Sequence, residues 1–65
     1  MTHIQLLERR LVEQLEKDRA HPSRCEQFAH LTRVSVSGTA CGLALAIGLA
    51  TGEENEAIYQ RVMSR

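Results

Sequence analysis

The sequence predicts an all-α domain: a small three- to four-helix bundle, or a helical hairpin with a short C-terminal helix. Three observations lead to this prediction. Leucines recur at helical spacing in residues 2–20, residues 40–50 are rich in Ala and Leu, and Gly52 separates this tract from a second amphipathic stretch. The 65 residues form one domain, 1–65. Large side chains are few, so the core is thin and we expect self-association to complete it.

An amphipathic helix is predicted over residues 2–20, with acidic and basic residues on its solvent faces. It ends before Pro22, because a proline disfavours helical dihedrals at the preceding His21. Any part of its apolar stripe that the fold leaves uncovered can dock into a groove of a partner. The candidate partner-binding residues on this helix are therefore Ile4, Leu7, Leu11 and Leu15.

A second helix is predicted to begin at Ser23, because Ser23 and Glu26 match the S-x-x-E capping box. The segment Val34–Ser37 is β-branched and Ser-rich, and it leaves two outcomes open. The helix continues through it, or it breaks there and restarts with Ser35 or Ser37 as N-cap. A strand is disfavoured because no pairing strand is evident.

Residues 34–52 carry no charge and contain all four glycines of the chain. Their length is near that of a membrane span, but the strongly apolar part, Leu43–Leu49, is much too short for one. The tract therefore predicts a fully buried central helix, and no membrane partner is expected. Its small residues let another helix, including one from a second copy, approach closely. Gly38, Gly42 and Ala46 are the candidate partner-binding residues on this helix.

A short C-terminal helix is predicted after Gly52, which can take the left-handed conformation that ends the central helix. Thr51 and Glu54 form a second possible capping box. Ile58 and Val62 mark the buried stripe of this last helix.

Eight basic and eight acidic residues give a formal net charge of zero, which argues against a general polyanion binder. A local DNA site is the alternative, because residues 27–40 resemble the first helix and turn of many DNA-binding helix-turn-helix segments. The pairs Phe28-Ala29 and Val34-Ser35 carry the resemblance, which implies DNA contacts from Arg24 and Arg33. The helix that follows offers no Arg, Lys, Asn or Gln to read base edges.

Metal and catalytic chemistry have weak support in the sequence. His21, Cys25, His30 and Cys41 match no common structural zinc spacing. A Cys–His pair lacks a recognisable third group to orient it, and a chain this short has little room for a pocket. We therefore expect no enzymatic activity, no metal and no cofactor. The polar N-terminus has no apolar signal segment, so a cytoplasmic protein with reduced thiols is expected.

These observations together predict a small non-enzymatic adaptor, inhibitor or regulator that acts through helical protein–protein contacts. It would work as a homodimer or with a helical protein partner. The alternative is a helix-turn-helix-type DNA-binding transcriptional regulator. The identity of the partner and the number of copies do not follow from the sequence.

Overall fold

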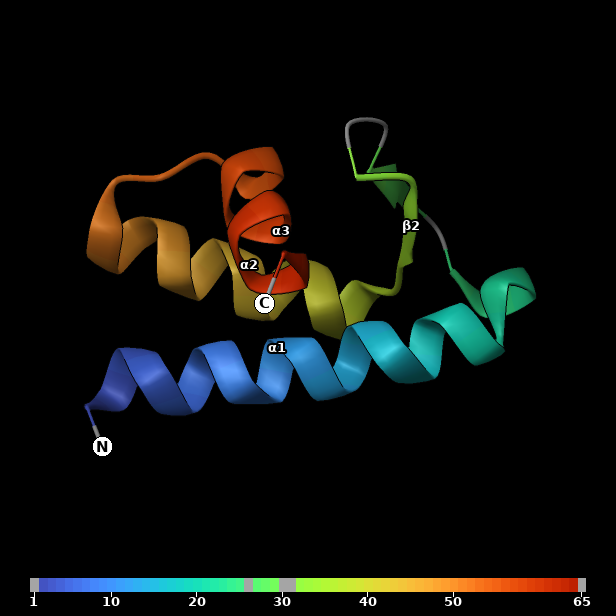
Figure 1. Ribbon diagram of the computed structural model, residues 1–65, viewed down its shortest axis with the longest axis horizontal. Helices are drawn as coiled ribbons and strands as arrows, with labels where there is room; N and C mark the ends of the chain where they lie inside the picture. Colours follow the sequence, from blue (N-terminus) through green and yellow to red (C-terminus); the bar gives the residue numbers. More distant parts are fainter. Residues whose placement is uncertain (1, 26, 30–31, 65) are drawn as a thin grey trace.

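The computed structural model describes residues 2–25, 27–29 and 32–64, which form a mostly helical domain of 32 × 21 × 20 Å. Helices α1 and α2 run antiparallel along its length, and the short α3 packs across α2 (Figure 1). A two-stranded sheet lies at the end where α1 finishes and α2 begins. In chain order the elements are α1 (His3–Ala20), the 3-10 turn η1 (Pro22–Arg24), β1 (Gln27–Ala29), β2 (Val34–Val36), α2 (Gly38–Thr51) and α3 (Asn55–Met63).

The N-terminal helix predicted over residues 2–20 is confirmed as α1. It begins with a capping box that we did not predict: Thr2 Oγ1 accepts from the Gln5 amide at 3.2 Å, and Gln5 Oε1 accepts from the Thr2 amide at 2.9 Å. At its end the His21 amide donates to the carbonyls of Lys17 and Asp18 before Pro22 turns the chain. The leucine stripe and the proline were sufficient to predict both limits.

The domain is mostly helical as predicted, but the second helix predicted from Ser23 is wrong and a small two-stranded sheet follows η1 instead. Residues 22–24 form a 3-10 turn, and residues 27–29 pair with residues 34–36 as an antiparallel hairpin. Val34 and Val36 alternate with Ser35, so an extended chain places both valines in the core, whereas a helix would separate them. Glu26, the partner in the proposed capping box with Ser23, lies outside the described residues.

The segment Val34–Ser37 does not belong to a continuous helix, which was one of the two outcomes left open, and α2 begins with Ser37 as its N-cap. The strand that the sequence disfavoured is present as β2, Val34–Val36, so that expectation is wrong. Ser37 Oγ accepts from the Ala40 amide at 3.3 Å. At the other end Gly52 adopts the predicted left-handed conformation, with φ 79°, and its amide donates to the Gly48 carbonyl at 2.7 Å.

The capping box expected from Thr51 and Glu54 is wrong. The Thr51 hydroxyl donates to the Ile47 carbonyl at 2.9 Å and accepts from the Glu53 amide at 3.3 Å. Glu54 is itself the N-cap of α3, and its side chain makes no capping hydrogen bond. The Thr51 hydroxyl therefore forms hydrogen bonds at the end of α2 and does not cap the start of α3.

The core lies between α1, α2, α3 and the hairpin. Its members are mostly small or branched: Leu11, Leu15, Ala29, Val34, Val36, Ala40, Ala44, Ile47, Ile58, Tyr59 and Val62. The expectation that α2 is buried on all sides is wrong. Only one of its faces enters the core, while Leu45 is 50% and Leu49 84% exposed. The other elements are too few to surround a central helix.

Candidate protein-binding surface

The exposed face of α2 carries a row of apolar residues that we call the α2 stripe: Gly38, Gly42, Leu45 and Leu49. Their spacings of four, three and four residues keep them within an arc of about 60° on a helix of 3.6 residues per turn. All four are exposed, and α2 has no charged side chain along its whole length. Exposed helix faces in soluble domains are ordinarily polar, so this stripe is unusual for a surface without a partner.

The predicted partner-binding residues of α2 lie on this exposed side. Gly38 and Gly42 belong to the stripe, and Ala46 is exposed beside it. A Cβ built on Gly38 or Gly42 would meet no atom within 4 Å, so the space in front of both glycines is open. Sequence analysis missed Leu45 and Leu49, although their spacing from Gly42 was a sufficient signal. The absence of charge on α2 predicts a helix buried on all sides, so its leucines are expected in the core.

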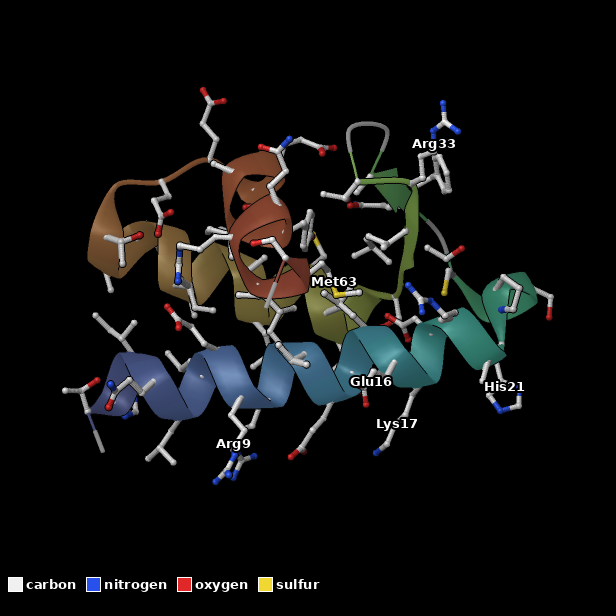
Figure 2. All side chains as sticks on the ribbon, viewed as in Figure 1. Arg9, Glu16, Lys17, His21, Arg33 and Met63 are labelled. Carbon is white, nitrogen blue, oxygen red and sulfur yellow. The ribbon has the colours of Figure 1, made fainter. Side chains whose placement is uncertain are left out.

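The predicted stripe of α1 is used inside the chain. Leu11 and Leu15 are in the core, and Leu7 is partly buried against it. Ile4 is also half-buried. The helix presents charged residues to solvent instead: Figure 2 shows Arg9 and Lys17 extending from α1 on the side away from α3. The apolar surface that α1 leaves to a partner is mainly Leu6, which is 45% exposed.

A carboxylate of α1 holds the start of α2 in place. Asp18 is buried; its Oδ2 accepts from the Ser37 amide and its Oδ1 from Gln14 Nε2, both at 2.9 Å. The negative charge lies at the N-terminus of α2, where the helix dipole favours an anion. Gln14 Nε2 also donates to Ser37 Oγ at 3.4 Å. Two hydrogen bonds, from the Ser37 amide to Asp18 and from Gln14 to the Ser37 hydroxyl, therefore join α1 to the start of α2. The orientation of the α2 stripe is therefore fixed relative to α1.

An ionic cluster holds the other end of the molecule. Arg61 Nη1 lies 2.5 Å from Glu8 Oε1, and the same guanidinium donates to both carboxylate oxygens of Glu53, at 2.8 and 3.1 Å. Hydrogen bonds from Arg61 lower the pKa of Glu53, and the two carboxylates raise the pKa of Arg61. The cluster joins α1, α3 and the connection between α2 and α3, so we assign it a structural role.

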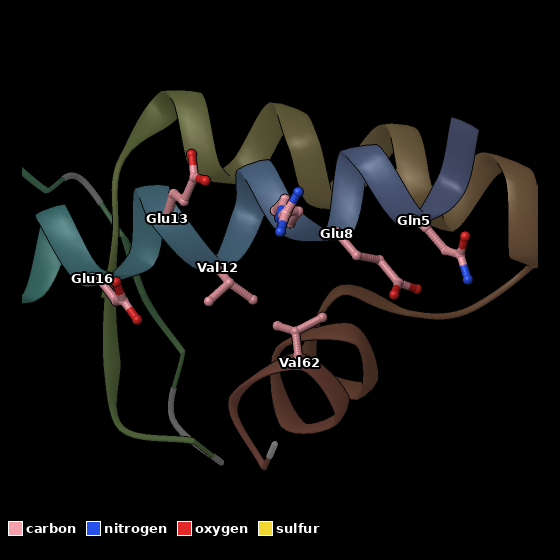
Figure 3. Close-up of a pocket in the computed structure, with 7 residues that line it drawn as sticks. Gln5, Glu8, Val12, Glu13, Glu16 and Val62 are labelled. Atoms are coloured by element: carbon pink, nitrogen blue, oxygen red, sulfur yellow. The ribbon is translucent and has the colours of Figure 1, made fainter. Parts of the chain in front are cut away.

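An open groove of about 540 Å³ runs between α1 and α3 (Figure 3). Its lining is mostly charged or polar: Gln5, Glu8, Arg9, Val12, Glu13, Glu16 and Val62. It contains no Ser, Thr, Cys, His or Tyr that could act as a nucleophile, and Glu8 is already held by Arg61. The residues of the groove do not form an arrangement with recognisable chemistry.

The cysteines and histidines do not form a reactive site in the described residues. Cys25 and Cys41 are free thiols, and the Cys25 Sγ lies 3.8 Å from the carbonyls of Asp18 and His21. Desolvation and the charge of Asp18 raise the pKa of the Cys25 thiol, which is opposite to the shift that activates a nucleophile. Within the described ranges no three His, Cys, Asp or Glu residues are placed to hold a metal, and His30 lies outside those ranges.

One buried hydroxyl in the core has no hydrogen-bond partner among the described residues. Tyr59 is almost fully buried, and its Oη is unpaired. Burial raises the pKa of Tyr59 to about 12, and the nearby Cys41, Glu56 and Asp18 add to the shift. An unpaired hydroxyl in a core costs free energy, so the ring of Tyr59 and not its oxygen contributes to the stability of the core.

The helix-turn-helix geometry expected for residues 27–40 is wrong, because the part expected to form its first helix is the strand β1. Arg33 is exposed at the hairpin turn with φ 56°, and its amide donates to the Ala29 carbonyl at 2.7 Å. Arg24 ends the 3-10 turn η1. Neither arginine lies on α2, so the helix in the place of a recognition helix presents only uncharged residues.

Comparison with known proteins gives no family assignment: no family model matches the chain, and neither the curated proteins nor the solved structures provide a match. In the part of the chain that the structure describes, no helix is long and apolar enough to cross a membrane. The exposed face of α2 is therefore the strongest basis for a functional proposal.

Proposed function

We propose that this chain is a small protein-binding module, an adaptor, inhibitor or regulator, that docks through the α2 stripe. The observation that carries the proposal is the exposure of Leu45 and Leu49 on a helix without charges. Fully burying one leucine stabilises a contact by about 1.5–3 kcal/mol. Two exposed leucines beside open glycines therefore provide both the driving force and the close approach that a helical partner needs.

The surroundings of the stripe support a role in binding over a role in catalysis. The helix is anchored at its start by Asp18 and at its end by the left-handed Gly52. A preorganised face loses little conformational entropy when a partner binds. The groove between α1 and α3 is lined by charged side chains and contains no nucleophile, so it is a weaker candidate for the functional site.

The test is an affinity pull-down from the native cell with three versions of the tagged chain. We expect the wild type to retain a protein that Leu49→Glu loses, because a carboxylate would be buried without a partner. Phe28→Glu is the matched control: Phe28 is also half exposed, but it lies on β1. Circular dichroism must show that both variants keep the helical fold. Retention of the same protein by Leu49→Glu would refute the α2 stripe as the docking surface.

A further inference from the structure

The sizes of the four residues of the α2 stripe follow a pattern that is complementary to itself. The N-terminal half has no side chains, at Gly38 and Gly42, and the C-terminal half has large ones, at Leu45 and Leu49. Positions 38 and 49, and positions 42 and 45, are equally distant from a point between residues 43 and 44. At a rise of 1.5 Å per residue, the outer pair lies about 8 Å and the inner pair about 2 Å on either side of that point.

We propose that the α2 stripe binds the α2 stripe of a second copy of this chain, antiparallel and about a two-fold axis next to the midpoint of α2. In this arrangement Leu49 of one copy lies over Gly38 of the other, and Leu45 lies over Gly42. Each leucine then fills the open space in front of a glycine. A two-fold contact uses the same patch on both copies, and this patch meets that requirement. The inference rests on the proposed function and names its partner.

The absence of charge on α2 also favours a second copy as the occupant. A partner with a charged face would bury that charge against leucines and glycines at a large cost in desolvation. The stripe of a second copy is uncharged, and its leucines match the glycines in number and position. Antiparallel packing also places the N-terminus of each helix beside the C-terminus of the other, which the helix dipoles favour.

The area of the contact predicts a weak, reversible dimer. A helix of 14 residues is about 21 Å long and about 10 Å wide, so α2 offers a face of about 200 Å² per copy. Stable complexes bury about 600–1,000 Å² per partner. We therefore expect a dissociation constant of about 10 µM or weaker, typical of a small interface.

Sedimentation velocity over a range of concentrations tests the pairing. We expect the wild type to move from the 7.3 kDa monomer toward twice that mass as its concentration rises from about 10 µM to about 1 mM. Leu49→Glu should stay a monomer throughout, and Phe28→Glu should behave as the wild type. A wild type that remains at 7.3 kDa at 1 mM overturns the self-pairing. The proposed function then stands or falls on its own pull-down, which reports a different protein on the same stripe.

Cross-linking tests the direction of the pairing. Two single variants, Gly38→Cys and Leu49→Cys, are made in a chain whose native thiols are removed by Cys25→Ser and Cys41→Ser. In the antiparallel pair, like positions of these two variants lie about 16 Å apart along the helix axis, whereas position 38 of one copy faces position 49 of the other. Under mild oxidation the antiparallel arrangement predicts disulfide-linked dimers mainly when the two variants are mixed, because a disulfide needs Cα atoms about 5.5–6 Å apart. Dimers that form equally well in each variant alone would show parallel or unspecific contact and overturn the proposed geometry.

Discussion

Two glycines of α2 predict opposite effects of alanine on the stability of the fold. A Cβ at Gly42 would meet no atom within 4 Å, whereas a Cβ at Gly48 would lie 2.8 Å from the backbone carbonyl oxygen of Glu53. Real Cβ atoms essentially never approach another atom that closely. The oxygen belongs to the connection between α2 and α3, so that connection has to move before Gly48→Ala can pack. Gly42→Ala requires no movement.

The magnitudes decide the sign of each effect. Alanine is favoured over glycine inside a helix by about 1 kcal/mol. At Gly42 nothing opposes this gain, and we expect the free energy of unfolding to rise by about 0.5–1 kcal/mol. At Gly48 the overpacking costs about 1–3 kcal/mol, which offsets the gain and leaves a net loss of up to about 2 kcal/mol. In a domain of this size each kcal/mol shifts the melting temperature by about 4–8 °C.

Thermal unfolding followed by circular dichroism measures the difference. The samples are kept at a concentration where the wild type is a monomer, so that any change in self-association does not affect the melting temperature. Gly42→Ala should melt above the wild type, and Gly48→Ala should melt below it by up to roughly 15 °C. If Gly48→Ala melts at or above Gly42→Ala, the close packing of α2 against the Glu53 carbonyl is not a feature of the folded protein.

Three further substitutions test the contacts that hold α2 and α3. Asp18→Ala removes the acceptor of the Ser37 amide, so the free energy of unfolding in urea should fall by about 1–3 kcal/mol; no change would contradict the anchoring role. Tyr59→Phe removes a hydroxyl without a partner and should leave stability at pH 7 equal or about 1 kcal/mol higher. The pKa of Tyr59 is raised from 10.0 to about 12, so the unfolded chain loses this proton at a lower pH than the folded chain. The wild type should therefore lose stability between pH 10 and 12, whereas the Tyr59→Phe variant should not. Parallel stability profiles of the two proteins would refute this. Arg61→Met removes the main cause of the lowered pKa of Glu53. In the wild type the contribution of this pair to stability is present above pH 4.5 and is lost as the pH falls through the lowered pKa, so acid unfolding should be less pH-dependent in the variant. An identical pH profile would exclude the pairing.

The sequence was sufficient to predict the parts of the fold that depend on local chemistry. The leucine spacing and Pro22 predicted α1, and the glycine at position 52 predicted the end of α2. Ser37 was one of two N-caps expected for a restarted helix, and the structure selects it. These signals act within one or two helical turns, so no knowledge of the tertiary fold was needed.

The hairpin was not predictable in the same way, because its pairing is set by tertiary contacts. The alternation of Val34 and Val36 around Ser35 was visible, but Gln27–Ala29 shows no strand pattern of its own. Two strands of three residues are too short to be stable alone. They form because β2 packs its two valines against α1, and this packing outweighs the helical propensity of the residues before it.

The same reasoning explains why the candidate surface was found only in part. A helix without charge was interpreted as a helix buried on all sides, which requires neighbours around its whole circumference. In this chain α1, α3 and the short hairpin are the described elements that can cover α2, and they cover the face with Ala40, Ala44 and Ile47. The opposite face, with Leu45 and Leu49, is also uncharged and is exposed, Leu45 to 50% and Leu49 to 84%. We propose that a second copy covers this face, because the antisymmetric order of its glycines and leucines is complementary to itself.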